Sequence, residues 1–139
     1  MKRNDYFRLF FDNERHNYRL IRMKADSNCF FRSLAFLIFK NQELHLDIRQ
    51  KIVDRMRTDY AINEISATTL KEYIENDNQL KTDFLITTEL ADLDNFRPSL
   101  YFDYMERQNV YGGHFEIGYF IKIWQKRVKD ELLEREKEK

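Results

Sequence analysis

Cys29 is the residue of this chain that most readily suggests chemistry. It is the only cysteine among 139 residues, and it directly follows Asp26, Ser27 and Asn28. These residue types often begin an α-helix, and a helix start lowers the pKa of a thiol through its macrodipole and unpaired N–H groups. The same N–H groups can stabilise the oxyanion of a tetrahedral intermediate. The pattern favours two interpretations, a nucleophilic thiolate or a small buried hydrophobic residue.

A nucleophilic cysteine requires a general base, which is normally a histidine. The chain has three histidines, His16, His45 and His114. His114 precedes Glu116 by two residues, but the sequence lacks the Pro-Cys-x-x-Cys motif that accompanies His-x-Glu in zinc deaminases. His114 could act as a substitute base if its turn approached Cys29, although a histidine in a first helical turn is more often structural. We expect His16 and His45 to lie on the surface.

The single cysteine also limits the other kinds of site. It cannot form a disulfide within the chain, and it excludes zinc sites built on pairs of CxxC motifs. We therefore expect no metal and no cofactor. The longest apolar run, Leu34–Phe39, has six residues, against roughly 20 for a membrane helix. The first 25 residues lack the apolar segment of a secretory signal, so we expect no membrane contact and an intracellular, cytoplasmic location.

The element that carries Cys29 is predicted to be a buried helix. Residues 29–39 have the sequence CFFRSLAFLIF and are apolar on nearly every side, as buried helices are. Asp26, Ser27 and Asn28 supply N-cap chemistry immediately before this run. Cys29 is therefore expected in the first turn of a central helix.

The rest of the chain predicts further helices, because it contains only one proline and three glycines. In residues 46–60, an apolar stripe includes Ile52 and Met56, with Arg49 on the opposite, polar face. A helix at 68–76 is expected to begin at Thr68 or Thr69. Other predicted helices open at Pro98 and at His114, the second continuing through Trp124. Residues 18–23 are predicted to be extended, and residues 77–97 predict no definite element.

The sequence around Cys29 resembles the nucleophile motif of the OTU (ovarian tumour) family of cysteine deubiquitinases, Asp-Gly-Asn-Cys-Leu-Phe-Arg-Ala/Ser. Six positions agree with the motif and two differ, Ser27 for glycine and Phe30 for leucine; the six are Asp26, Asn28, Cys29, Phe31, Arg32 and Ser33. A second block, His45–Met56, is similar to the helix that follows the nucleophile helix in the family. A third resembles its Tyr…Met…Trp/Tyr-Gly-Gly-x-x-Glu-Leu/Ile stretch and contains Tyr101, Met105, Tyr111, Gly112, Gly113, Glu116 and Ile117.

The resemblance implies an α+β, papain-like OTU fold, predominantly helical in this chain with a reduced or missing sheet. The resemblance covers residues 18–125 as an OTU-like domain, and the composition of the remaining residues predicts an N-terminal arm or helix at 1–17 and a charged helical tail at 126–139. Cys29 would be the nucleophile, and Asp26 would belong to the loop that shapes the oxyanion hole. The Gly112–Gly113 turn and the helix of Glu116 would support the site. The partner would be ubiquitin or a ubiquitinated protein, although no histidine occupies the family's base position.

Charge is distributed unevenly along the neutral chain. Residues 1–25 hold seven basic and three acidic side chains (net +4), and residues 59–106 hold three basic and eleven acidic ones (net −8). An acidic, aromatic-rich middle argues against nucleic acid. The acidic region is either a solvated face or a surface for a basic protein. Three hypotheses follow: an active deubiquitinase, a catalytically incomplete relative that binds ubiquitin or another protein, and a helical interaction protein with an accidental resemblance.

Overall fold

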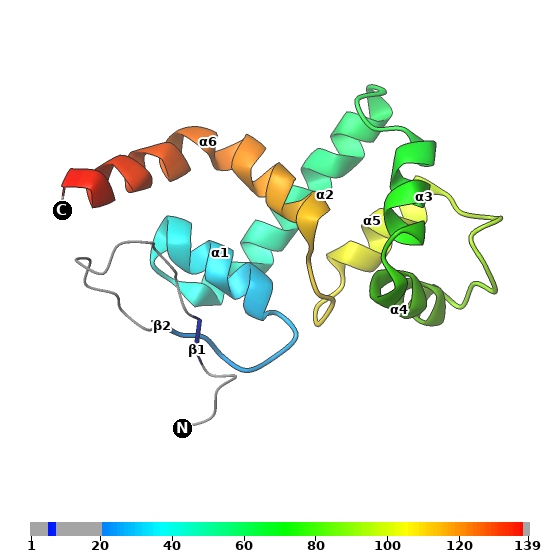
Figure 1. The fold of residues 1–139 in the computed structure, drawn as a ribbon, viewed down its shortest axis with the longest axis horizontal. Helices are drawn as coiled ribbons and strands as arrows, with labels where there is room; N and C mark the ends of the chain where they lie inside the picture. The colour runs from blue at the N-terminus through cyan, green and yellow to red at the C-terminus, as the bar shows by residue number, and fades with distance from the viewer. Residues whose placement is uncertain (1–5, 8–20, 138–139) are drawn as a thin grey trace. The chain divides into compact units, whose positions relative to one another are not determined.

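The structure, a computed structural model of the chain, describes residues 6–7 and 21–137. Most of the described residues belong to helices (Figure 1). The elements, in chain order, are β1 (Tyr6–Phe7), β2 (Ile21–Arg22), α1 (Cys29–Phe39), the 3₁₀ helix η2 (Gln42–Leu44), α2 (His45–Ala61), α3 (Ala67–Glu75), α4 (Asn78–Thr88), α5 (Pro98–Glu106) and α6 (His114–Lys137).

The expected α+β, papain-like fold is wrong. Within the described residues the only β structure is the antiparallel pair β1–β2, two residues in each strand, with Tyr6 opposite Arg22 and Phe7 opposite Ile21. A pair of this size cannot form one layer of an α+β domain. The physical reason lies in the sequence after the Gly112–Gly113 turn, where helix-forming residues with many possible i,i+4 charge pairs continue α6 to Lys137. The predicted arm at 1–17 lies outside the described residues, apart from Tyr6 and Phe7.

The chain divides into two compact units. The first contains the residues up to Ile48 together with those from Tyr111 onward, and the second runs from Arg49 to Val110. The boundary falls within α2. Each unit has its own buried apolar residues, so each is described separately.

In the first unit, α1 is the most buried element, as its sequence predicts. Phe31, Leu34, Ala35 and Ile38 have at most 8% of their surface exposed. The helix ends at Lys40, whose left-handed backbone lets its N–H donate to the carbonyl of Phe36. Helix α6 lies against α1 (Figure 1). The buried face of α1 therefore fixes the position of its first residue, Cys29.

In the second unit, α3, α4 and α5 pack around Phe84, which is fully buried. Its ring contacts those of Phe96, Tyr101 and Tyr104 at centroid distances of 5.2 to 6.3 Å. Helix α4 lies within residues 77–97, for which the sequence predicts no definite element. Its start is capped by Asp77, whose carboxylate accepts the Leu80 N–H at 3.1 Å.

Of the two predicted helix starts in this unit, one agrees with the structure and one is displaced. Helix α3 begins at Ala67 because the Ser66 hydroxyl accepts the Thr69 N–H, so the predicted start at Thr68 or Thr69 is wrong by one or two residues. Helix α5 opens at Pro98, as predicted. Proline fits there because a first-turn N–H has no partner within the helix.

Candidate active site

The loop before Cys29 is folded around Asp26. One carboxylate oxygen of Asp26 accepts the Asn28 N–H at 3.0 Å, and the Asp26 carbonyl accepts the Cys29 N–H at 3.2 Å. Asn28 is the N-cap residue of α1, but its side chain makes no capping hydrogen bond. The capping chemistry expected from residues 26–28 therefore comes chiefly from Asp26.

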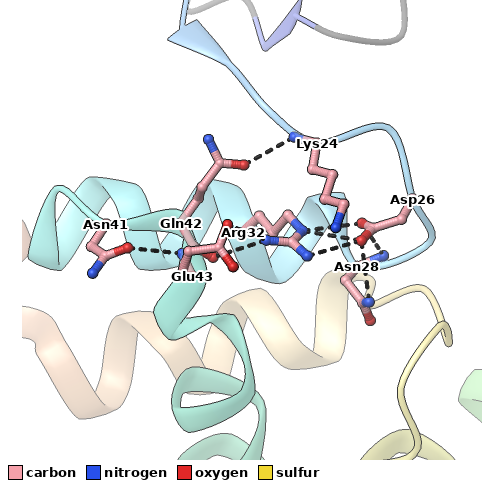
Figure 2. Close-up of polar contacts among 7 residues, drawn as sticks. All are labelled: Lys24, Asp26, Asn28, Arg32, Asn41, Gln42 and Glu43. Atoms are coloured by element: carbon pink, nitrogen blue, oxygen red, sulfur yellow. Dashed lines mark hydrogen bonds and ion pairs between the residues drawn. The ribbon is translucent and has the colours of Figure 1, made fainter.

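Arg32 holds the same carboxylate from the second turn of α1. Its Nε lies 3.2 Å from each oxygen of Asp26, and its Nη2 lies 3.0 Å from Oδ2 (Figure 2). Arg32 Nη1 also pairs with the Glu43 carboxylate at 3.4 Å. Only 4% of Arg32 is exposed, so solvent screens the Asp26 contact less than it screens a surface ion pair.

The ion pair shifts the pKa values of both partners. Burial alone would raise the pKa of Asp26, but hydrogen bonds from the Arg32 side chain and the Asn28 N–H outweigh it, and the pKa lies below its usual value. Burial alone would lower the pKa of Arg32, but the bond to Asp26 outweighs it, and the pKa rises. Both groups are therefore charged at neutral pH.

A second anchor ties the loop to η2. The Lys24 N–H donates to the Gln42 side-chain carbonyl at 2.9 Å (Figure 2). Asn41 starts η2 by accepting the Glu43 N–H at 3.0 Å. The loop is thus held through Lys24 at one end and through Asp26 near Cys29 at the other.

Cys29 is the first residue of α1 and is half-buried. The Ser33 hydroxyl donates to the Cys29 carbonyl at 2.8 Å. A thiolate at this position would lie at the positive end of the helix macrodipole. The carboxylate of Asp26 would oppose a second negative charge, but its pairing with Arg32 offsets this effect.

The two departures from the family motif fit the local structure. Ser27 does not have a positive φ, so serine meets no left-handed strain where the family has glycine. The Phe30 ring packs edge-on against Phe31, with 5.0 Å between centroids and an interplanar angle of 83°.

The Gly112–Gly113 turn is fixed by the helix that it precedes. The Gly113 N–H donates to the Glu116 carboxylate at 2.8 Å, and the Gly113 carbonyl accepts the Ile117 N–H at 3.0 Å. Glu116 is the third residue of α6 and is fully buried. A glutamate that bonds back to the N–H before the helix is one half of a capping box.

His45 and His114 are the histidines that the structure describes. His45 is the first residue of α2 and only 5% exposed, so the expectation that it lies on the surface is wrong. His114 is exposed at the first position of α6, and His16 lies outside the described residues. Within the described residues, no hydrogen bond joins a histidine to the Cys29 sulfur.

Arg49 is a buried residue whose role was not predicted from the sequence. It is 1% exposed, and it donates to the carbonyls of Met105 at 2.7 Å and Val110 at 2.8 Å. Its assignment to the polar face of α2 is therefore wrong. The spacing of Arg49 from Ile52, Val53 and Met56 already matched one helical face, and this was the signal available in the sequence.

The part of the chain that the structure describes also bears on two other kinds of site. No group of three or more His, Cys, Asp or Glu side chains there could hold a metal ion. None of the helices there is both long enough and apolar enough to cross a membrane.

The three blocks that resemble the OTU family occur in α1 with its preceding loop, in α2, and between α5 and the start of α6. The resemblance rests on these short motifs. No protein-family model, no curated protein and no solved structure matches the chain.

Proposed function

We propose that the chain is an OTU-like cysteine deubiquitinase that hydrolyses peptide or isopeptide bonds after the C-terminal glycine of ubiquitin. The observation that carries this proposal is the bonded arrangement of Asp26, Asn28 and Arg32 around the helix start where Cys29 lies. These four residues agree with the family's nucleophile motif. Their mutual contacts give a physical reason for a motif of this spacing.

The proposed chemistry begins with the Cys29 thiolate. It attacks the carbonyl carbon of the scissile bond and forms a tetrahedral oxyanion, which collapses to a thioester as the C–N bond breaks and the amine leaves with a proton taken from solvent water. Water then hydrolyses the thioester and regenerates the thiol. Asp26 acts in this scheme as a positioning residue, because its bonds to Arg32 and to the Asn28 N–H fix the loop beside the nucleophile.

A second candidate function is binding of ubiquitin without turnover. It is favoured by the lack of a hydrogen bond between any described histidine and the Cys29 sulfur, because both steps above need a proton carrier. The acidic region of residues 59–106, with a net charge of −8, would then attract the arginine-bearing C-terminal tail of ubiquitin. Such binding would weaken as the salt concentration rises.

The proposal also includes an intracellular, cytoplasmic location. A nucleophilic cysteine must stay reduced, and cytosolic thiols are kept reduced. The lone Cys29 has no partner within the chain for a disulfide.

Labelling and turnover together test these candidates. A ubiquitin probe with a C-terminal electrophile is incubated with the wild-type chain and with Cys29→Ala, and cleavage of a ubiquitin C-terminal fluorogenic amide is measured in parallel. Labelling and cleavage that both depend on Cys29 would support the enzyme. Salt-sensitive ubiquitin binding without cleavage would support the second candidate and overturn the first. If the chain shows neither binding nor labelling, both candidates are overturned and the helical interaction protein is favoured.

A further inference from the structure

Gly112 leaves space that the ring of Phe30 occupies. A Cβ atom placed on Gly112 would lie 2.5 Å from Cδ1 and from Cε1 of Phe30, and 3.1 Å from Cε2 of Phe31. Contacts below 3.0 Å essentially never occur for real Cβ atoms, so any side chain at Gly112 would force a rearrangement. The backbone of Gly112 does not have a positive φ. This position therefore requires the absence of a side chain rather than the conformational freedom of glycine.

The structure also indicates which group would move. Phe31 is fully buried, and the turn is held by the two bonds of Gly113, to the Glu116 carboxylate and from the Ile117 N–H. Phe30 is only half-buried, and its ring packs edge-on against Phe31. A side chain at position 112 would therefore displace the Phe30 ring before it displaced the turn or Phe31.

Displacement of Phe30 would reach Cys29 through the backbone. Phe30 directly follows Cys29 in the first turn of α1. On its other side, Cys29 is held by the bond from its N–H to Asp26, and its carbonyl accepts the Ser33 hydroxyl. With the loop fixed by Arg32, movement of Phe30 would alter the first helical turn, where the thiol meets the helix macrodipole.

From this geometry we infer that Gly112 is a positioning residue for Cys29, acting through the Phe30 ring. The inference deepens the proposed function, on which it rests in naming Cys29 the nucleophile. It assigns the Gly112–Gly113 turn an effect on the thiol that passes through Phe30, beyond general support of the fold. It also couples Gly112 to Phe30, a position where the chain departs from the family motif.

The test uses the thiol itself and needs no ubiquitin. Alkylation by iodoacetamide reports Cys29 alone, because the full chain has no other cysteine. The second-order rate is measured from neutral to alkaline pH for the wild type, Gly112→Ala, Phe30→Leu and the double variant. The matched control is Gly118→Ala, the same substitution in α6, where a new Cβ would meet nothing within 4 Å. Circular dichroism and urea denaturation check folding.

We expect Gly112→Ala to slow alkylation of Cys29 at neutral pH about tenfold, because a thiol moved away from the helix start loses the favourable contact with the helix macrodipole. The double variant should react within about twofold of Phe30→Leu, and Gly118→Ala should react like the wild type. An unchanged profile in folded Gly112→Ala would overturn the inference, and so would a double variant as slow as Gly112→Ala. If Gly112→Ala fails to fold, a double variant that folds and reacts like Phe30→Leu supports the coupling, and one that also fails to fold overturns it.

Failure of the proposed function would give a different set of results from failure of the inference about Gly112. The ubiquitin probe would then leave wild-type Cys29 unlabelled, whereas the alkylation profiles would still differ between Gly112→Ala and Gly118→Ala. If the probe labels the wild type but the alkylation profiles coincide, the proposed function stands and the positioning role of Gly112 is wrong.

Discussion

Arg32 binds both carboxylate oxygens of Asp26, with three nitrogen–oxygen distances between 3.0 and 3.2 Å. The two residues lie on either side of Cys29 in the sequence, one in the loop and one in the second turn of α1. Their ion pair therefore bridges Cys29 and fixes the backbone before it relative to the helix after it. It also offsets the negative charge that would otherwise disfavour a nearby thiolate.

Arg32→Lys should weaken this bridge while keeping the positive charge. A lysine ammonium cannot reproduce the planar, two-pronged contact of a guanidinium. We expect the free energy of unfolding, measured by urea denaturation, to fall by about 2 kcal/mol, and alkylation of Cys29 to slow. Arg57→Lys is the matched control, because Arg57 also pairs with carboxylates, those of Asp54, Asp103 and Glu106, but its side chain is 36% exposed. It should cost about 0.5 kcal/mol, and equal losses in both variants would contradict the prediction.

The stabilisation by Asp26 should disappear in acid. Its pKa lies below the usual value because the bonds from Arg32 and the Asn28 N–H outweigh the opposing effect of burial. A carboxyl with a lowered folded pKa stabilises the fold above its unfolded pKa, and the stabilisation is lost as the pH falls through the folded value. The stability difference between wild type and Asp26→Asn should thus be constant near neutral pH and shrink below about pH 4. Urea denaturation across pH measures it, with the exposed Asp47→Asn as control; a difference that grows in acid would refute the assignment.

The sequence predicts the elements whose signals are local. Residues 29–39 are apolar on nearly every side and form α1 with the predicted bounds. Pro98 begins α5, and the Gly112–Gly113 turn precedes a helix at His114, as predicted. Each of these depends on neighbouring residues alone, and for that reason a single sequence is sufficient.

Features that depend on contacts distant in the sequence were not predicted. Helix α4 is stabilised by packing of Phe84 against Tyr101 and Tyr104. No periodic pattern of apolar residues within residues 77–97 predicts this helix. The charge of Arg49 suggested a solvated position, whereas in the interior it donates hydrogen bonds to two backbone carbonyls more than 50 residues away. In the same way, three short motifs can specify the loop before Cys29 without specifying a sheet, which is why the papain-like fold did not follow from them.

Arg49 should be among the most sensitive positions of the second unit. Arg49→Met removes the two guanidinium nitrogens that donate to the buried carbonyls of Met105 and Val110, so both carbonyls lose these hydrogen bonds. We expect the free energy of unfolding to fall by about 3 kcal/mol. The control is Lys51→Met, the same replacement of a cation at an exposed position of α2, which should change stability by less than about 0.5 kcal/mol. Similar urea midpoints for the two variants would show that the Arg49 contacts contribute little.

Glu116 should stabilise the Gly112–Gly113 turn through hydrogen bonding more than through charge. Its buried carboxylate accepts the Gly113 N–H at 2.8 Å, and a glutamine side-chain carbonyl could accept the same bond. Glu116→Gln should therefore keep most of the wild-type stability, whereas Glu116→Ala should lose about 2 kcal/mol because the bond is lost and a buried side chain is truncated. Urea denaturation compares the variants, and hydrogen exchange of the Gly113 amide reports the bond directly. Faster exchange in Glu116→Ala only is the expected result, and equal losses in both variants would mean that the negative charge is what the site requires.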